Sequence, residues 1–243
     1  MRLLVIPARG GSKRIPRKNI KQFAGRPIIA WSIEAATQSG AFDEIVVSTD
    51  DDEVAQVARD WGASVPFMRQ SQLANDHTGT RAVVTDAIER LSPTEGFTCC
   101  LYATAPFVTS ADLRTAAELL STARQVDTIV SVIRVDSSLL RSFAVADGRL
   151  VRLLPEYASA RSQDLPPVYR DAGQFYLARN ARWRDPHTSI THQALPYELP
   201  AERTVDIDTP EDWQRAEAAF LQWTDGGTRE LSQSSGPSGS DTQ

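Results

Sequence analysis

The stretch from residue 6 to residue 19 constrains this chain most, because a basic, glycine-containing loop directly follows a buried strand. Residues 3–6 form the apolar run Leu-Leu-Val-Ile, which predicts a strand covered on both faces. A glycine pair follows, with five cations between Arg9 and Lys18. Open α/β sheets bind ligands at the carboxyl ends of their strands. Glycines let a backbone approach a ligand closely, and cations attract anions. The stretch therefore predicts a polyphosphate-binding loop.

The spacing within this loop fits neither of two common phosphate-binding motifs. It is not a Walker A loop, and it is not the glycine motif of dinucleotide-binding folds. A solvated basic turn is the structural alternative. We interpret the loop as a set of backbone N–H groups, together with Lys13 and Lys18, that binds a triphosphate.

Composition and charge narrow the class of protein. The chain has 243 residues, 41% of them hydrophobic, which predicts one globular α/β domain. A net charge of -5 argues against a nucleic-acid partner and makes the basic loop a focused anion site. Adjacent Cys99 and Cys100 should point to opposite faces of a strand, as buried thiols without a disulfide. With no signal-peptide pattern and no apolar run of about 18 residues, we expect a cytoplasmic protein without a membrane partner.

Strands and helices alternate through the first part of the chain. Strands are expected at residues 3–6, 44–48, 65–68, 98–102 and 128–133. Helices are expected at 26–36, from the acidic run at 50–53 to residues 61–62, at 82–91, and at 110–124. The acidic run is compatible with a metal site, but we interpret it as helix capping, because Asp50 and Glu53 have nearly the capping-box spacing. The alternation predicts a parallel sheet with helices on both faces.

The alternation stops after residue 134. Residues 135–200 contain many prolines and short extended pieces, which indicates an inserted arm or hairpin or else a plain surface extension. A strand is then expected at 203–207, followed by a helix with Thr209 as its cap and Pro210 in its first turn. Residues 224–243 are almost devoid of apolar side chains, and this composition predicts a disordered tail.

Two further segments carry candidate chemistry. Asp206 and Asp208 lie two apart on a predicted strand and should share a face, which suits Mg²⁺, although a helix cap also explains Asp208. Residues 161–176 combine cations, amides and aromatic rings around a glycine, which suits a carboxylated sugar, with an ordinary loop and strand edge as the alternative. The histidines at 77, 187 and 192 lack metal-ligand spacing. The first is a candidate for lining the site, and the other two are expected in loops.

Four motifs in this order resemble the landmarks of the CMP-sugar synthetases, at residues 6–19, 47–50, 104–106 and 206–209. These cytidylyltransferases activate sialic acid, other nonulosonic acids and the eight-carbon octulosonate. The likeness extends from residue 2 to about residue 220. Within the family, the opening loop and residues 161–165 and 169–176 are most similar to the pseudaminic acid branch.

This resemblance implies an α/β, Rossmann-like nucleotidyltransferase fold with a mostly parallel sheet and a small inserted dimerisation arm. It implies a single cytidylyltransferase domain at residues 1–223, with the arm contained in 135–200 and also contributing to sugar binding. A homodimer is implied, with CTP and a nine-carbon sugar acid as substrates and Mg²⁺ as cofactor.

The resemblance also implies roles for individual residues. Arg9 and Lys18 would act on the triphosphate and, with Asp208, form the catalytic set, while Asp206 and Asp208 would bind magnesium. The implied nucleotide-binding residues are Ala8, Arg9, Gly10, Lys13, Lys18, Asn19, Arg69, Thr80 and Thr104. The implied sugar-binding residues are Gln163, Arg170, Gln174 and Tyr176.

The chain departs from the sialic acid synthetases at two positions. They have a base-reading Gln where this chain has Tyr102, and an Asn where it has Ala172. A third change, Ala103 for the usual proline, should matter little. The implied reaction joins CTP and a nonulosonic acid, with pseudaminic acid as the leading candidate, to give a CMP-sugar and pyrophosphate. Legionaminic, sialic and octulosonic acids remain alternatives, as does a non-catalytic CTP-binding protein. The sequence names no general base.

Overall fold

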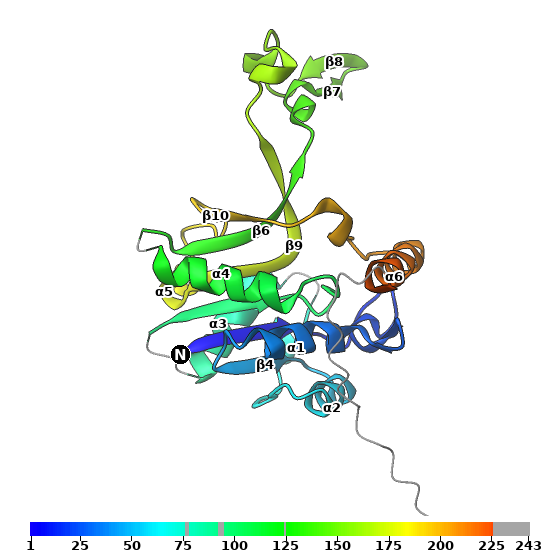
Figure 1. Cartoon of the computed structure of the whole chain (residues 1–243), viewed down its shortest axis with the longest axis vertical. Coiled ribbons are helices and arrows are strands. Elements are labelled where there is room, and N and C mark those ends of the chain that lie inside the picture. Colours follow the sequence, from blue (N-terminus) through cyan, green and yellow to red (C-terminus); the bar gives the residue numbers. More distant parts are fainter. Residues whose placement is uncertain (76–77, 92–94, 124, 226–243) are drawn as a thin grey trace, which may run out of the picture.

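The chain forms a three-layer α/β body from which a narrow arm projects (Figure 1). The computed structural model describes residues 1–75, 78–91, 95–123 and 125–225. Over these residues, six strands form the central sheet in the order β10-β6-β9-β5-β1-β4. They are β1 (Arg2–Pro7), β4 (Glu44–Ser48), β5 (Phe97–Leu101), β6 (Thr128–Val135), β9 (Val168–Arg179) and β10 (Leu195–Glu198).

The sheet is mostly parallel, as the alternation of elements predicts. Strand β1 pairs in parallel with β4 and β5, and β10 pairs in parallel with β6. Strand β9 is the exception, because it runs antiparallel between β5 and β6. The strand that departs from the pattern thus comes from the segment in which the sequence shows no clear period.

Helices cover both faces of the sheet. Leu4 and Cys99 belong to a buried cluster that includes side chains of α1, α2 and α4. Leu3 and Cys100 belong to the cluster on the opposite face, with side chains of α3 and α5. Both cysteines are buried free thiols, so that prediction is confirmed. The helices are α1 (Ile28–Ser39), α2 (Asp52–Asp60), α3 (Thr80–Leu91), α4 (Ser110–Thr122), α5 (Asn180–Arg184) and α6 (Pro210–Asp225).

Local capping chemistry sets several helix ends. Helix α1 ends where Gly40 takes a left-handed φ of 61°. Thr109 caps α4 through a reciprocal pair of bonds with Asp112. Thr209 makes the same exchange with Asp212 at the start of α6, so this cap is confirmed. At α2 the capping residue is Asp51, whose side chain accepts from the Val54 N–H, and the prediction of Asp50 was one residue too early.

Three predicted elements differ from the structure. Residues 65–68 form no strand and contribute only an isolated bridge between Thr49 and Met68. Residues 204–208 are irregular rather than a strand. The first two residues of the helix predicted at 26–36 instead form β3 (Arg26–Pro27), which pairs with β2 (Gln22–Phe23). These segments are short, and contacts with distant parts of the chain decide their conformation.

The projecting arm is narrower than the segment 135–200. It leaves the sheet at the end of β6 and returns along β9, with a small hairpin near its tip (Figure 1). That hairpin pairs β7 (Phe143–Ala146) with β8 (Arg149–Arg152). Residues 168–179 and 195–198 instead lie in the central sheet. At the other end of the chain, α6 extends to Asp225, and residues 226–243 of the predicted tail lie outside the described residues.

An aromatic cluster attaches α6 to the N-terminal part of the chain. The Phe220 ring lies 5.4 Å from that of Phe23 and 4.7 Å from that of Trp31, measured between centroids. Ile15 and Ile207 are buried in the same cluster. The cluster therefore joins the segment after the basic loop to the segment that contains the two predicted metal ligands.

We expect Phe220→Ala to lower the free energy of unfolding by about 3–5 kcal/mol, because it leaves a cavity among packed aromatic rings. Phe220 is 1% exposed, whereas its neighbour Leu221 is 46% exposed, so Leu221→Ala is the matched control. Urea unfolding followed by circular dichroism measures both. Equal effects of the two substitutions would show that the cluster is not a major source of stability.

Candidate active site

The basic loop is held by the two acidic residues that precede α2. The Gly10 N–H donates to an Asp50 carboxylate oxygen at 3.0 Å. A Cβ atom on Gly10 would lie 2.7 Å from the Asp51 Cβ, so this position requires glycine. A Cβ atom on Gly11 would meet nothing within 4 Å. The first glycine therefore permits the close packing of the loop against α2.

Arg17 adds an ionic clamp at the other end of the loop. Its backbone takes a left-handed φ of 56°, and its guanidinium pairs with both oxygens of Asp51, at 2.5 and 3.0 Å, and also with Glu53. The hydrogen bond from Arg17 lowers the pKa of Asp51. The acidic run thus caps a helix and positions the loop. No group of three or more His, Cys, Asp and Glu residues suited to a metal ion occurs in the described parts of the chain.

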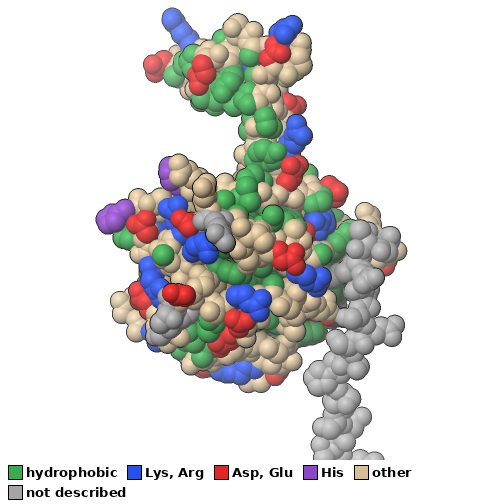
Figure 2. Space-filling model, turned by 60° about the vertical axis from the view of Figure 1, so that its left-hand side comes forward, with side chains coloured by type: hydrophobic (Ala, Val, Ile, Leu, Met, Phe, Trp, Pro, Cys, Tyr) green, Lys and Arg blue, Asp and Glu red, His purple; other side chains and the backbone are tan. Residues whose placement is uncertain are grey.

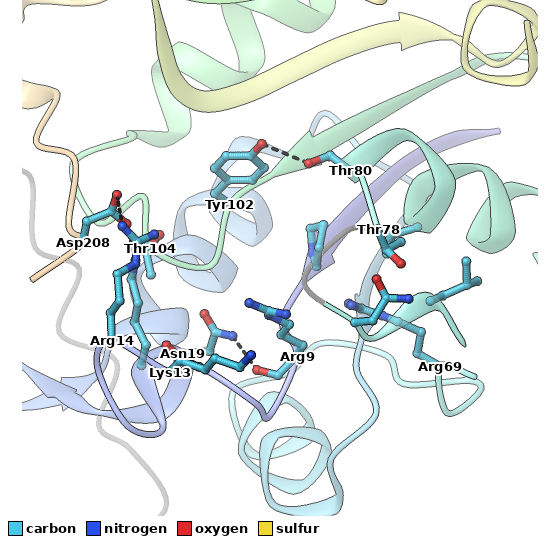
Figure 3. A pocket seen from close by; sticks show the side chains of 16 residues that line it. Arg9, Lys13, Arg14, Asn19, Arg69, Thr78, Thr80, Tyr102, Thr104 and Asp208 are labelled. Atoms are coloured by element: carbon cyan, nitrogen blue, oxygen red, sulfur yellow. Dashed lines mark hydrogen bonds and ion pairs between the residues drawn. The ribbon is translucent and has the colours of Figure 1, made fainter. Parts of the chain in front are cut away.

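A cavity of about 760 Å³ opens above the loop, and we call it the first chamber. Figure 3 shows Arg9, Asn19 and Arg69 facing the same space, with Tyr102 and Thr80 across from them. The chamber is lined by Pro7, Arg9, Ser12, Lys13, Arg14, Lys18, Asn19, Arg69, Leu73, Asn75, Thr78, Thr80, Val83, Tyr102, Thr104 and Asp208. Seven of the nine predicted nucleotide-binding residues are in this set. Ala8, which is fully buried, and Gly10 support the loop without lining the chamber.

Two of these residues are positioned by the backbone around them. Asn19 donates from its side-chain amide to the Arg9 carbonyl at 2.9 Å, which holds the two ends of the loop together. Arg69 is only 6% exposed and donates from its guanidinium to the carbonyl and to the hydroxyl of Ser48. Burial lowers the pKa of Arg69 from its ordinary value. The first chamber is therefore lined by a cation, Arg69, whose guanidinium is fixed by hydrogen bonds to Ser48.

A second chamber of about 390 Å³ adjoins the first. It is lined by Lys18, Tyr102, Thr104, residues 170–174, Tyr176 and residues 204–208. Lys18, Tyr102, Thr104 and Asp208 line both chambers. Of the predicted sugar-binding residues, Arg170, Gln174 and Tyr176 line the second chamber, whereas Gln163 lies in the arm, in the short helix Ser162–Asp164.

Asp208 lies at the junction of the two chambers, between two cations. Its carboxylate is 2.7 Å from a guanidinium nitrogen of Arg14 and 3.6 Å from the ammonium nitrogen of Lys18. Burial lowers the pKa of Lys18, and Asp208 partly counteracts that effect. Arg14, which the sequence analysis did not single out, lines the first chamber. The sequence signal that could have identified Arg14 as a lining residue is its position inside the basic loop.

The orientation of the aspartate pair follows from the residue between them. Ile207 is 2% exposed and belongs to the aromatic cluster, while Asp206 and Asp208 line the second chamber. A buried ion pair anchors the preceding turn. The Arg203 guanidinium donates to both oxygens of Asp112, at 2.8 and 3.1 Å.

Tyr102 and Tyr176 lie side by side where the chambers meet. Their ring centroids are 5.8 Å apart, and the Tyr102 hydroxyl is 3.0 Å from the Thr80 hydroxyl. The Tyr176 hydroxyl donates to Asp171 at 2.7 Å. Burial is the main reason why the pKa of each tyrosine is raised. Asp171 is a further lining residue that the sequence analysis did not select.

Neither of the two histidines in the described ranges lines a chamber. His187 and His192 lie in turns, as predicted, and His77 falls outside the described residues. None of the helices in the described ranges combines the length and the apolar character that crossing a bilayer requires.

Comparison with known proteins identifies the family. A family model described as Cytidylyltransferase matches residues 3–221. The chain belongs to the cytidylyltransferase family, whose members are nucleotidyltransferases. A pseudaminic acid cytidylyltransferase of Campylobacter jejuni is 40% identical over 90% of this chain and 95% of its own length. A CMP-N,N'-diacetyllegionaminic acid synthase of Legionella pneumophila is 36% identical over 89% of this chain and 95% of its own length.

Solved structures support the fold. A CMP:2-keto-3-deoxy-manno-octonic acid synthetase complexed with CTP superposes with a TM-score of 0.70 at 19% identity, covering 91% of this chain and 98% of the other. A 4-diphosphocytidyl-2C-methyl-D-erythritol synthase from Anaerococcus prevotii gives a TM-score of 0.64 at 13% identity, covering 91% and 98%. The predicted nucleotidyltransferase fold is therefore confirmed.

We expect Asp112→Asn to lower the free energy of unfolding at pH 7 by about 3 kcal/mol, because it breaks the buried pair with Arg203. Burial alone would raise the pKa of Asp112, but bonds from Arg203 and Thr109 outweigh it and hold the pKa below its ordinary value. The stabilisation that the ionised Asp112 carboxylate provides is therefore fully present above its pKa in the unfolded chain, about 4. It is lost as the pH falls through the lower pKa of Asp112 in the folded protein. The gap between wild type and variant should narrow below about pH 4.

Urea unfolding at pH 7 and at several values below 4 measures that gap. The control is Asp60→Asn, at the exposed end of α2. A gap that stayed constant over the acid range would show that the charge of Asp112 does not stabilise this turn.

Proposed function

We propose that this protein activates a nine-carbon sugar acid, pseudaminic acid first among the candidates, by transferring CMP to it from CTP. The observation that carries the proposal is the pair of chambers that share Lys18, Tyr102, Thr104 and Asp208. The first chamber has the cations that a triphosphate needs, and the second combines two cations, an amide and carboxylates suited to a sugar acid. Similarity to two pseudaminic acid cytidylyltransferases, at 40% and 39% identity, favours this substrate.

In the proposed reaction the anomeric hydroxyl of the sugar acid attacks the α-phosphorus of CTP, and pyrophosphate leaves. Phosphoryl transfer depends mainly on positioning and on stabilisation of charge. Arg9 and Lys13 would bind the triphosphate in the first chamber, while Lys18 would stabilise charge on the α-phosphate at the junction. Arg170 would hold the carboxylate of the sugar in the second chamber.

The aspartate pair fits the magnesium ion that such a reaction uses. Asp206 and Asp208 supply hard oxygen donors, and Asp208 already attracts two cationic side chains. Two protein carboxylates are sufficient for Mg²⁺, which takes its other oxygens from phosphates and water. When bound, the ion would polarise the phosphate. The release of Asp208 from Arg14 would free that guanidinium for the triphosphate.

The decisive experiment measures pyrophosphate release from CTP with a panel of pseudaminic, legionaminic, sialic and octulosonic acids. We expect the highest kcat/KM with pseudaminic acid. Preference for another acid would overturn the choice of substrate, with legionaminic acid the strongest competitor because of the 36% identical relative. Binding of CTP without turnover of any acid, with Mg²⁺ present, would instead indicate a non-catalytic nucleotide-binding protein.

In the same assay Asp208→Ala should abolish turnover while leaving the circular dichroism spectrum unchanged. The physical reason is loss of the carboxylate shared by the two chambers. Asp60→Ala on α2 is the matched control and should retain full activity. Near-normal turnover by Asp208→Ala would remove this residue from the proposed mechanism.

We also propose that the arm forms a homodimer. Figure 2 shows hydrophobic side chains exposed at the end of the arm. Val145 and Leu150 face each other across the hairpin and are 73% and 70% exposed. Apolar side chains exposed in this way favour burial against a partner. A partner seated there would also bring Gln163, on the same arm, against another copy of the chain. Such a cytidylyltransferase would work in the cytoplasm, where CTP is available.

The replacement of both Val145 and Leu150 by Asp should convert a dimer into a monomer in multi-angle light scattering, because charges cannot be buried cheaply in an apolar contact. The pair Val145→Leu and Leu150→Val keeps the apolar surface and serves as control. A monomeric wild type, or a dimeric Asp variant, would contradict this role of the arm.

A further inference from the structure

A left-handed turn at Arg17 lies immediately before Lys18 in the basic loop. Arg17 has a φ of 56°, a region that residues with a Cβ atom rarely adopt. Its carbonyl accepts from the N–H groups of Ile20 and Lys21, both at 3.0 Å, which forms the short 3₁₀ helix Lys18–Ile20. Lys18 lines both chambers, whereas Arg17 lines neither of them. The turn therefore separates a side chain that faces the chambers from one that is directed elsewhere.

The side chain of Arg17 is held by the acidic residues at the start of α2. Its guanidinium donates to both oxygens of Asp51, at 2.5 and 3.0 Å, and also to Glu53. Two such contacts fix the orientation of a guanidinium as well as its position. Asp51 is itself fixed, because it accepts from the Val54 N–H at 3.0 Å. Arg17 is thus tied to a helix rather than to another part of the loop.

The ion pair of Arg17 differs in location from those of its basic neighbours. Arg14 and Lys18 pair with Asp208 at the junction of the chambers, at 2.7 and 3.6 Å. A charged ligand in the chambers would compete for those two contacts. Arg17 and Asp51 line neither chamber, so their contact can persist while a ligand is bound.

We infer that Arg17 is a positioning residue, whose ion pair with Asp51 maintains the left-handed turn that directs Lys18 to the junction of the chambers. A strained backbone conformation persists only where the surrounding contacts maintain it. Because the loop is already ordered in the free protein, less affinity for a triphosphate is lost to ordering it. This inference rests on the proposed function, since CTP is the ligand in its test.

The test compares Arg17→Ala with Arg17→Gly. Both substitutions remove the ion pair, but only glycine adopts the left-handed region without strain. We expect Arg17→Ala to raise the Kd for CTP about fivefold and Arg17→Gly about twofold, on the scale of an ion pair that is partly exposed. Isothermal titration calorimetry with CTP in the presence of Mg²⁺ measures both values.

Hydrogen exchange in the free protein provides a second measurement that needs no ligand. The backbone N–H groups of Ile20 and Lys21 donate to the Arg17 carbonyl, so their exchange rates report on the turn. We expect these two amides to exchange faster in Arg17→Ala than in the wild type, with Arg17→Gly in between. Mass spectrometry of peptides that cover residues 18–21 follows this exchange.

Arg2→Ala is the matched control. Arg2 makes the same kind of contact with Asp43, at 3.0 and 2.7 Å, and lies at the opposite end of β1 from the basic loop. Its replacement should leave both measurements unchanged. Asp51 is unsuitable for substitution, because it also caps α2 and packs against Gly10. If Arg17→Ala does not fold, Arg17→Ser replaces it, since serine also has a Cβ atom and cannot reach α2.

The outcomes separate this inference from the proposed function. An unchanged Kd for CTP in Arg17→Ala, or equal increases in the alanine and glycine variants, would overturn the positioning role. A change confined to the midpoint of urea unfolding would also overturn it. A larger Kd and faster exchange in Arg17→Ala than in Arg17→Gly support the inference. Failure of the wild type to turn over any acid would overturn the proposed function instead, and the exchange rates would still decide the role of Arg17.

Discussion

Burial of Ile207 in the aromatic cluster is the interaction on which the geometry of the site depends. This residue packs in the same cluster as Ile15, although the two are far apart in the chain. Their association brings the basic loop and the aspartate pair to one place. Because side chains on either side of a buried residue must point elsewhere, Asp206 and Asp208 line the second chamber. The apolar packing of Ile207 against α6 thus keeps the two neighbouring carboxylates at the chamber surface, where their charges do not have to be buried.

Electrostatic balance within the loop is equally important. A loop with five cations is costly to fold on itself, because like charges repel at short range. The acidic residues before α2 reduce that cost, since Asp51 pairs with Arg17 and Asp50 accepts from Gly10. Arg9 and Lys13 nevertheless line the first chamber. An acidic protein can in this way focus positive charge at one position.

Strand β9 links the two regions that differ most in character. Its first half belongs to the base of the arm, and its second half is buried between β5 and β6. The register of β9 against β6 shifts between these halves, and residues 170–174 beside this shift line the second chamber. The base of the arm and one wall of the second chamber therefore belong to one continuous strand.

The sequence alone predicts those elements that are set by contacts between residues close together in the chain. The apolar run at 3–6 and the cap at Thr209 each predict their structure, because the responsible contacts lie within a few residues. The basic loop likewise indicated an anion site from its own residues. The choice of CTP, by contrast, came from family resemblance, since phosphate chemistry does not distinguish one base from another.

Tertiary structure alone decided which side chains share a chamber. The irregular path of residues 204–208 and the ion pair between Asp208 and Arg14 both depend on contacts between segments distant in sequence. A β-bulge is invisible to a pattern of period two, because the extra residues reverse the alternation. The sequence alone therefore predicts the basic loop that lines the first chamber. The wall that β9 contributes to the second chamber forms only when β9 lies between β5 and β6, because pairing with both neighbours sets where its register shifts.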